Sequence, residues 1–302
     1  DAGQESQMPK FPETTAQRET GDGACGPFEA VLFSDSGGLT QFATGGSDIN
    51  LFGRTIPLYV TDINVGLLFL VSVPSIGVYG IILAGWASNS KYPLLASLRA
   101  SAQLVSYEIA VTMTLVSLVM TAGTLSMVGI VEAQRDFSLS LGPFQLRGLW
   151  FVFAQPVAFL LVLIGGLAET NRAPFDLAEA ESELTGGFHT EYSSMKFGMF
   201  FLAEYMHVFI GSILITTFFF GSYHLPFADL YIPADMNMWL KGILDVSVFT
   251  VKVCFWCFVF IWVRWTIPRF KYNQVMKLGW ARLLPLSLIN FMVIATIMYF
   301  TN

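Results

Sequence analysis

The sequence has few charged residues and few residues that commonly bind metals. Asp, Glu, Lys and Arg make up 13% of its 302 residues, whereas soluble domains carry about 25%. It has only three cysteines and three histidines. Because these do not form an iron–sulfur or zinc ligand set, we predict no metal site, and we expect any electron carrier to belong to a partner.

The cysteines themselves do not point to redox chemistry. Cys25 stands alone in a polar segment, and Cys254 and Cys257 lie in an apolar run as Cys-Phe-Trp-Cys. That spacing can mark a metal or redox site, but no second Cys or His pair accompanies it. A free cysteine inside a membrane helix behaves as a small apolar residue, so we expect ordinary packing. A net charge of −6 without a basic, aromatic-interleaved patch also gives no sign of nucleic-acid binding.

Long apolar runs dominate what is present. The sequence is 54% apolar with a mean hydropathy of +0.59, and a membrane helix needs about 20 apolar residues. We therefore predict an all-α polytopic membrane protein with about six transmembrane helices. The candidate spans are 64–86, 104–123, 148–168, 197–220, 242–263 and 280–300. Pro74 and Pro156 interrupt two of them and favour kinks there.

The first 60 residues differ from the remainder. They are rich in Gly, Ser, Thr, Asp and Glu and have no apolar run long enough to span a membrane. We predict a poorly ordered N-terminal segment at 1–60, without a signal peptide, and a transmembrane helical domain at 61–302. The short apolar patches 28–33 and 56–60 could form small strands or an interfacial turn.

Basic residues set the expected orientation. The loops 87–103, 169–196 and 264–279 carry eight Lys and Arg in total, four of them in 264–279, whereas the alternate loops 124–147 and 221–241 carry three. The positive-inside rule places these loops in the cytoplasm and both termini outside.

Several ionisable residues fall inside the predicted spans, where a charge is costly and suggests function. Glu108 lies in the second span, Glu204 and His207 lie in the fourth, and Asp245 and Lys252 lie in the fifth. The alternatives are ion pairs that hold helices together, or side chains that extend to the interface. Asp245 and Lys252 are seven residues apart and therefore share a helix face. Asp245 could instead stabilise a helix N-terminus, and His207 could be a core histidine.

The loop after the third span is strongly acidic. Residues 169–192 contain a single arginine, Arg172, and six carboxylates. The carboxylates are Glu169, Asp176, Glu179, Glu181, Glu183 and Glu191. Pro174 favours a helix over 175–184, and Gly186-Gly187 would end it. This helix would place Asp176, Glu179 and Glu183 on one face, where mutual repulsion would give raised, shared pKa values. The alternative is a solvated acidic face. We expect Arg172 to pair with a carboxylate and order the loop, whereas His189 and His224 lie in loops without a metal-like cluster.

These residues resemble one protein family. Residues 168–177 read Ala-Glu-Thr-Asn-Arg-Ala-Pro-Phe-Asp-Leu, and further matching stretches follow in order. These are 62–66, 85–92, 98–100, 106–108, 201–205, 262–270 and 278–280, together with Glu191-Tyr192. Over about 61–300 the chain is similar to the quinone-site membrane subunit of respiratory NADH:quinone oxidoreductase (complex I), a family with bacterial members and a mitochondrial counterpart called subunit 1. The residues at 192–197 resemble those of bacterial members.

The resemblance implies a function in coupling quinone reduction to proton translocation. At the positions that match the family's residues, the proton path or its mouth would include Glu108, Glu169, Glu181, Glu183, Glu204 and Lys252. The quinone chamber and its loop would include Arg99, Arg172, Asp176, Glu179, Glu191, Tyr192, Arg264 and Arg269. Quinone would be the substrate, and NADH, flavin and iron–sulfur clusters would bind only to partner subunits. The implied partners are the peripheral-arm, small membrane and antiporter-like subunits, together with lipid, and the implied location is the bacterial inner membrane.

One part of the family pattern is not visible. Family members begin with a membrane helix, an amphipathic helix and a second membrane helix, which residues 1–60 do not show. We therefore expect a truncation, a split product or an unusual extension. Other readings remain open from the sequence: a membrane subunit of an energy-converting hydrogenase or coenzyme dehydrogenase, a secondary cation transporter, or a scaffold used only in assembly.

Overall fold

The computed structural model describes residues 48–51, 54–57, 63–141, 144–176, 187–226 and 238–301. Five of its helices are long and apolar enough to cross a membrane. They are α3 (Gly66–Ala87), α4 (Lys91–Ala122), α9 (Ser194–Phe219), α11 (Met238–Thr266) and the run formed by α12 (Tyr272–Leu278), η3 (Gly279–Leu283) and α13 (Leu284–Thr301). The prediction of an all-α polytopic membrane protein is confirmed.

The third predicted span is broken into two helices. Helix α6 covers Phe151–Ala154 and α7 covers Pro156–Glu169, with Gln155 between them at φ −133°. Proline disfavours the helical conformation in the residue before it and occupies the first helical position well. The predicted effect of Pro156 is therefore confirmed. The other proline, Pro74, lies within the continuous helix α3.

One predicted boundary is wrong. Residues 91–103 were expected in a loop, but α4 begins at Lys91 and continues to Ala122, where Gly123 ends it at φ +72°. This first part of α4 is more polar than a membrane span, so hydropathy alone did not include it. Its buried side chains, which include Ala96, Ala100 and Gln103, show that packing supports the helix there.

A short helix and a two-stranded hairpin lie between the second and third predicted spans. Helix α5 (Met127–Asp136) begins after Ser126, whose hydroxyl accepts a hydrogen bond from the backbone N–H of Gly129 at 3.2 Å. Strands β3 (Ser138–Leu141) and β4 (Phe144–Arg147) pair antiparallel. Hydropathy analysis predicted only a loop here.

A second antiparallel hairpin lies inside the predicted N-terminal segment. It is formed by β1 (Asp48–Leu51) and β2 (Arg54–Pro57). The rest of that segment through residue 47, including the patch at 28–33, lies outside the described residues, as does most of the helix predicted at 175–184.

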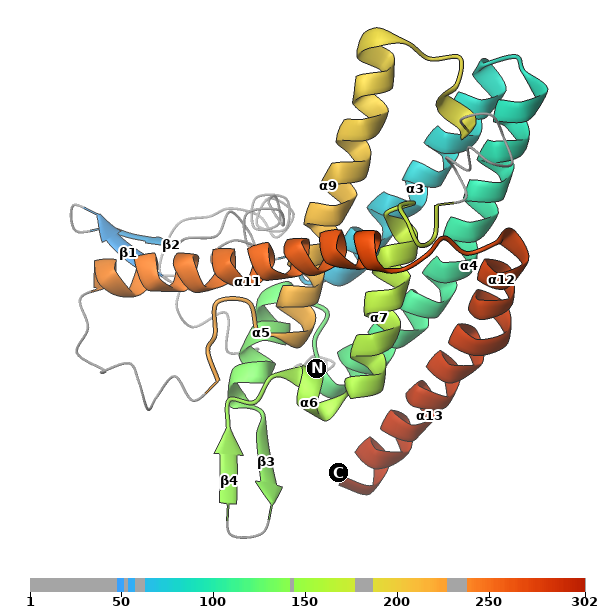
Figure 1. Ribbon diagram of the computed structural model, residues 1–302. Helices are drawn as coiled ribbons and strands as arrows, with labels where there is room; N and C mark the ends of the chain where they lie inside the picture. Colours follow the sequence, from blue (N-terminus) through green and yellow to red (C-terminus); the bar gives the residue numbers. More distant parts are fainter. Residues whose placement is uncertain are drawn as a thin grey trace, which may run out of the picture. The chain divides into compact units, whose positions relative to one another are not determined.

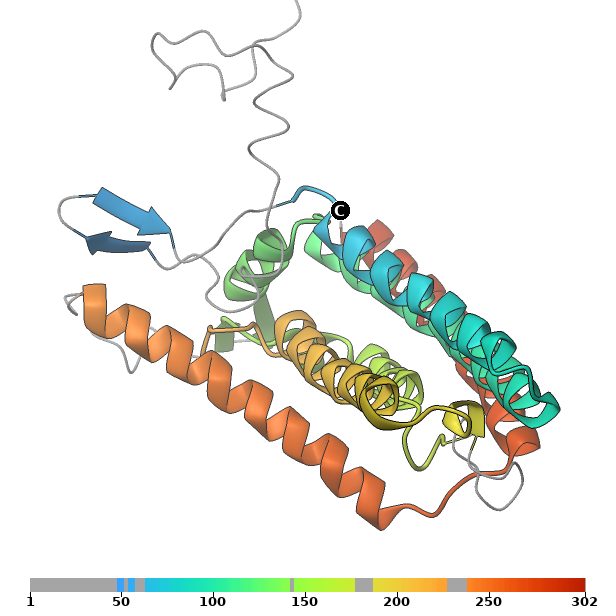
Figure 2. The ribbon, with the colours of Figure 1, turned by 90° about the horizontal axis from the view of Figure 1, so that it is seen from above.

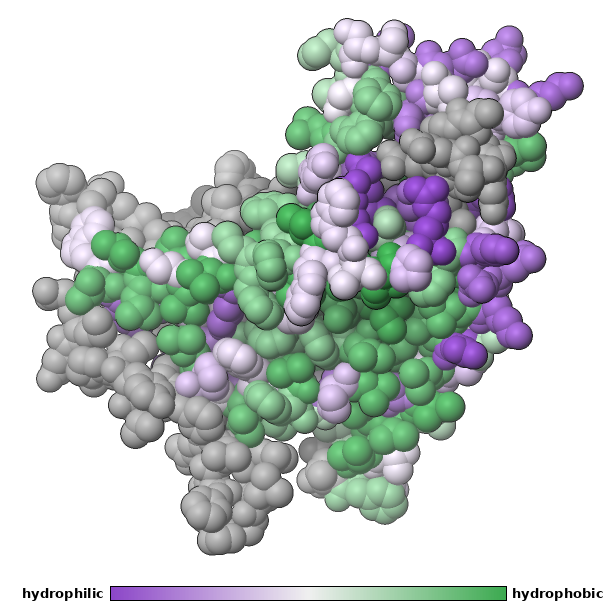
Figure 3. Space-filling model, in the orientation of Figure 1, coloured by the Kyte–Doolittle hydropathy of each residue, from purple (hydrophilic) through white to green (hydrophobic). Residues whose placement is uncertain are grey.

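The helices pack around α4. Helix α4 contacts α3, α7 and α13, while α9 lies between α7 and α11 (Figures 1 and 2). The buried core includes Tyr107, Leu118, Ile215 and Phe219, and Cys257 packs against it. Large apolar side chains on the outer faces of α3, α9 and α11 are exposed, as expected for lipid contact. Polar residues gather over the α3–α4 turn and around α12 (Figure 3).

Candidate functional site

A cavity of about 300 Å³ lies among α3, α4, α7 and α9. Most of its lining is apolar. Five ionisable side chains join that lining: Tyr107, Glu108, Glu169, Glu204 and His207. The space is large enough for several water molecules. The structure therefore brings together three of the predicted proton-path carboxylates, although 35 to 61 residues separate neighbouring members in the sequence.

Glu108 and Glu169 form one side of this group. Glu108 lies on α4 and accepts a hydrogen bond from the hydroxyl of Ser75 on α3. Glu169 is the last residue of α7, and its charge interacts with that of Glu108. Two negative charges at the wall of an apolar cavity repel each other more strongly than they would in water.

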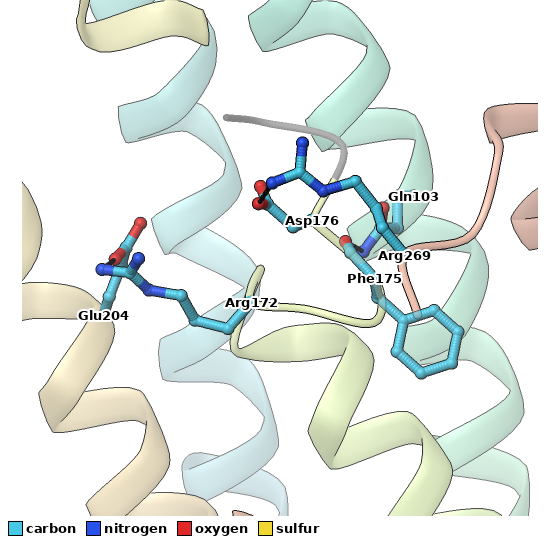
Figure 4. A network of polar contacts seen from close by, with 6 residues as sticks. All are labelled: Gln103, Arg172, Phe175, Asp176, Glu204 and Arg269. Atoms are coloured by element: carbon cyan, nitrogen blue, oxygen red, sulfur yellow. Dashed lines mark hydrogen bonds and ion pairs between the residues drawn. The ribbon is translucent and has the colours of Figure 1, made fainter. Parts of the chain in front are cut away.

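Glu204 on α9 forms the other side and is paired with Arg172. The two side chains are only 13% and 9% exposed and form an ion pair (Figure 4). The guanidinium also lies over the rings of Phe201 and Tyr205, with its central carbon 4.8 and 5.7 Å from the ring centroids. A partly buried ion pair is sensitive to any change in either partner's charge. The prediction that Arg172 pairs with a carboxylate is confirmed, but the partner is on α9.

The segment that follows α7 is held from two sides. The buried amide of Gln103 on α4 donates to the carbonyl oxygens of Ala168 and Phe175 at 3.1 and 2.9 Å. The guanidinium of Arg269 donates to the carboxylate of Asp176 at 2.7 Å (Figure 4). These contacts fix the position of the first part of the acidic loop relative to the cavity.

A smaller pocket of about 60 Å³ lies next to the cavity. Arg172, Tyr205 and Arg264 line it, and Glu204 and Thr170 line both spaces. Glu204 therefore stands between an apolar cavity that contains carboxylates and a pocket that contains two arginines.

The last part of the acidic loop lies at the α3–α4 turn. The hydroxyl of Tyr192 donates to the carbonyl of Ala84 at 2.8 Å, and that of Ser90 donates to Glu191 at 3.1 Å. His189, in the short helix η2 (Gly187–His189), packs against the rings of Phe188 and Phe197. Burial, and then the charge of Arg172, lowers its pKa from 6.5.

Three other predicted residues lie apart from the cavity lining. Arg99 lies over the ring of Tyr272, with 4.9 Å from its central carbon to the ring centroid. Asp245 is buried on α11. Its charge acts on Tyr223, whose pKa is raised by burial and by the charges of Glu132 and Asp245. The charge of Arg135 partly offsets this rise in pKa.

Lys252 is the third of these residues. Its ammonium group donates to three backbone carbonyls in the loop after α9. The predicted path residues Glu181 and Glu183 and the predicted loop residue Glu179 lie outside the described residues.

The structure adds residues that sequence reasoning did not select. Ser75 contacts Glu108, and Gln103 holds the loop segment. Asn171 lines the cavity, and its buried side-chain oxygen has no hydrogen-bonding partner among the described residues. In the sequence, the one signal for these residues is that they are polar within apolar surroundings, because the groups that they contact lie on other helices or segments.

Comparison with known proteins gives consistent matches. A family model described as NADH dehydrogenase matches residues 48–295. The chain is 52% identical over 239 residues to NADH-quinone oxidoreductase subunit 8 of Rhodothermus marinus, with 78% of this chain and 68% of that protein covered. It is 47% identical over 248 residues to a NADH-quinone oxidoreductase subunit of Flavobacterium johnsoniae, with 82% and 67% covered. For the corresponding NADH-quinone oxidoreductase subunit of Salinibacter ruber the identity is 50% over 239 residues, with 78% and 67% covered.

Proposed function

The chain belongs to the NADH dehydrogenase family, and from this membership we propose that it is a membrane subunit of a proton-pumping NADH:quinone oxidoreductase. In this proposal it forms part of the quinone chamber and couples quinone reduction to proton translocation. It acts only within the assembled enzyme.

The observation that carries the coupling proposal is the shared cavity of Glu108, Glu169 and Glu204. Carboxylates at the wall of a low-dielectric cavity respond strongly to nearby charge. The ion pair between Arg172 and Glu204 joins this group to the segment after α7. A change in that segment would alter the charge balance at Glu204 and then at the other two carboxylates.

In our proposal, quinone reduction causes the change in the segment after α7. Quinone takes up two electrons and two protons, and negative charge in a dry chamber is unfavourable unless protons or cations accompany it. Arg172, Arg264 and Arg269 are the basic groups assigned to this task, and Asp176, Glu191 and Tyr192 order the loop. The proposed chamber also includes Arg99 and Glu179, and the proposed path also includes Glu181 and Glu183.

The remaining assignments follow from the family. We propose peripheral-arm, small membrane and antiporter-like subunits as partners, with NADH, flavin and iron–sulfur clusters bound by partners alone. The matched relatives are bacterial, which supports the bacterial inner membrane as the location. The division into an N-terminal segment at 1–60 and a helical domain at 61–302 is part of the same proposal.

The test is Glu204→Gln in the assembled enzyme, with quinone reduction and proton translocation measured in parallel. The amide keeps the shape of Glu204 but cannot carry its charge, so we expect translocation to fall by at least about tenfold, a lower bound because one acid–base group typically contributes about 10²–10⁴-fold. Glu132→Gln on α5 is the matched control, because Glu132 is exposed and does not line the cavity. Normal rates of both processes in Glu204→Gln would remove Glu204 from the path.

A further inference from the structure

Lys252 on α11 makes an unusual set of contacts. Its ammonium nitrogen lies 2.7, 2.8 and 2.6 Å from the carbonyl oxygens of Phe220, Ser222 and His224. An ammonium group has three N–H donors and no acceptor. These three contacts can therefore use its whole donor capacity on the loop that follows α9.

Two further groups near the ammonium interact favourably with a positive charge. The ammonium also lies over the ring of Trp150, 4.8 Å from the centroid, which is a favourable cation–π position. The indole N–H of Trp150 donates to the carbonyl of His224 at 3.3 Å, so the same aromatic residue helps hold the loop. Phe220 directly follows the last residue of α9, and the C-terminal end of a helix carries partial negative charge.

The loop shape brings these carbonyls to one nitrogen. Gly221 and Ser222 adopt positive φ values of 65° and 49°, and the left-handed region turns the chain sharply. The backbone N–H of Ser222 donates back to the carbonyl of Thr216 at 3.1 Å. The carbonyls held by Lys252 are therefore joined to the last turn of α9.

Helix α9 carries Glu204 of the proposed path and His207, which also lines the cavity. Glu204 precedes Phe220 by 16 residues, which corresponds to about 24 Å along a helix. The first half of α9 is largely exposed, while its buried residues begin at Ser212. Contacts near the C-terminal end of α9 therefore act together with the Arg172–Glu204 ion pair in setting the axial position of Glu204 and His207. A shift of α9 along its axis would break all three hydrogen bonds to Lys252 together.

We propose that Lys252 is a positioning residue that latches the C-terminal end of α9 to α11 and so fixes Glu204 and His207 relative to Glu108 and Glu169. This inference rests on the proposed function, since it assigns Lys252 a task in the proton path. It differs from the prediction from sequence that Lys252 itself carries protons. A latch needs N–H donors and a positive charge, whereas a carrier must release its proton.

Arginine and methionine separate these two roles. Lys252→Arg keeps the charge and offers five N–H donors but cannot be deprotonated. Lys252→Met keeps much of the length and removes every donor. Lys241→Met is the matched control, because Lys241 is an exposed lysine on the same helix. Each variant is made in the assembled enzyme, and protons translocated per quinone reduced are measured between pH 6 and 8.

We expect Lys252→Met to lose about tenfold in translocation per quinone reduced, because a misplacement near 1 Å at a reacting centre can cost up to about 10²-fold. We expect Lys252→Arg to retain most translocation with an unchanged pH profile. Lys241→Met should match the wild type.

Three results would overturn the proposed latch. The first is an equal loss of proton translocation in Lys252→Arg and Lys252→Met, and the second is full translocation in Lys252→Met. The third is failure of both variants to assemble, which would assign Lys252 to folding alone. Glu204→Gln, measured alongside, separates this outcome from failure of the proposed function. Normal rates in Glu204→Gln would remove Glu204 from the path and count against the proposed function, whereas a failure of the latch result alone leaves the path standing.

Discussion

Arg269 donates a hydrogen bond at 2.7 Å to Asp176, although 93 residues separate them in the sequence. The Asp176 side chain is 4% exposed and that of Arg269 is 40% exposed. A nearly buried carboxylate needs such a partner, because an unpaired buried charge is costly. The pair therefore ties the first part of the acidic loop to the segment that follows α11.

The first prediction concerns this pair. Asp176→Asn and Arg269→Gln should each slow quinone reduction, and the double variant should lose little more than either single variant. We expect a coupling free energy of about 1 kcal/mol, since the exposed arginine is screened by water. Quinone reduction rates of the four membrane preparations give this value directly. Fully additive losses would show that the two side chains act separately, and Lys277→Gln serves as a control at an exposed cation.

The second prediction uses two buried glutamines. Gln103 bonds to Ala168 and Phe175, and Gln134 bonds to Thr217 at 2.9 Å. Gln103→Leu and Gln134→Leu should each lower stability by about 1–3 kcal/mol, because buried carbonyls lose their donor. Only Gln103→Leu should also raise the KM for quinone, because Gln103 holds the loop segment. Thermal inactivation and quinone kinetics measure the two effects, and an equal change in KM for both variants would contradict the assignment.

The sequence predicted the residues of the site better than their partners. Glu108 and Glu204 could be selected because a charge inside an apolar run is costly wherever its helix packs. The convergence of Glu108, Glu169 and Glu204 on one cavity depends on how α4, α7 and α9 pack, which periodicity does not determine. Glu169 was selected only through the family resemblance and its place in the acidic loop.

Main-chain partners were the least predictable feature. Lys252 binds three backbone carbonyls, and every residue has a carbonyl, so no pattern of residue types identifies them. Hydropathy likewise missed the start of α4 at Lys91, because that part of the helix is held by packing and is not apolar along its whole length. Pro156 was informative because its effect on the preceding residue is local.

The third prediction concerns the space in the cavity. A Cβ atom on Gly77 of α3 would have no heavy atom within 4 Å, and Gly77 lines the cavity. Gly77→Phe should therefore fill part of the cavity, displace water and reduce proton translocation several-fold. Gly198→Phe is the matched control, since Gly198 also has open space around it but does not line the cavity. Equal translocation in both variants would show that the cavity volume is not used.

The fourth prediction follows from the lowered pKa of His189. The folded protein binds this proton less readily than the unfolded chain, for which the ordinary value is 6.5. Stability contributed by neutral His189 is therefore present above that value and is lost as the pH falls below it. His189→Phe places a ring that cannot be protonated beside Phe188 and Phe197. Its loss of thermal stability between pH 7.5 and 5.5 should be smaller than that of the wild type, and an identical loss would contradict this account.

The last prediction tests how Glu108 is held. The hydroxyl of Ser75 contacts both Glu108, across the α3–α4 contact, and the carbonyl of Val71 in its own helix at 3.0 Å, whereas that of Ser72, one turn earlier, donates to the carbonyl of Phe69 in its own helix. A hydrogen bond to a carboxylate is about twice as strong as one between neutral groups. Ser75→Ala should therefore free the Glu108 side chain and lower proton translocation several-fold, with quinone reduction less affected. Ser72→Ala removes the same hydroxyl from the same helix and should leave both rates unchanged. Measured together, the two variants separate the contact with Glu108 from any general effect of removing a serine hydroxyl from α3, and matching losses would assign the effect to the helix alone.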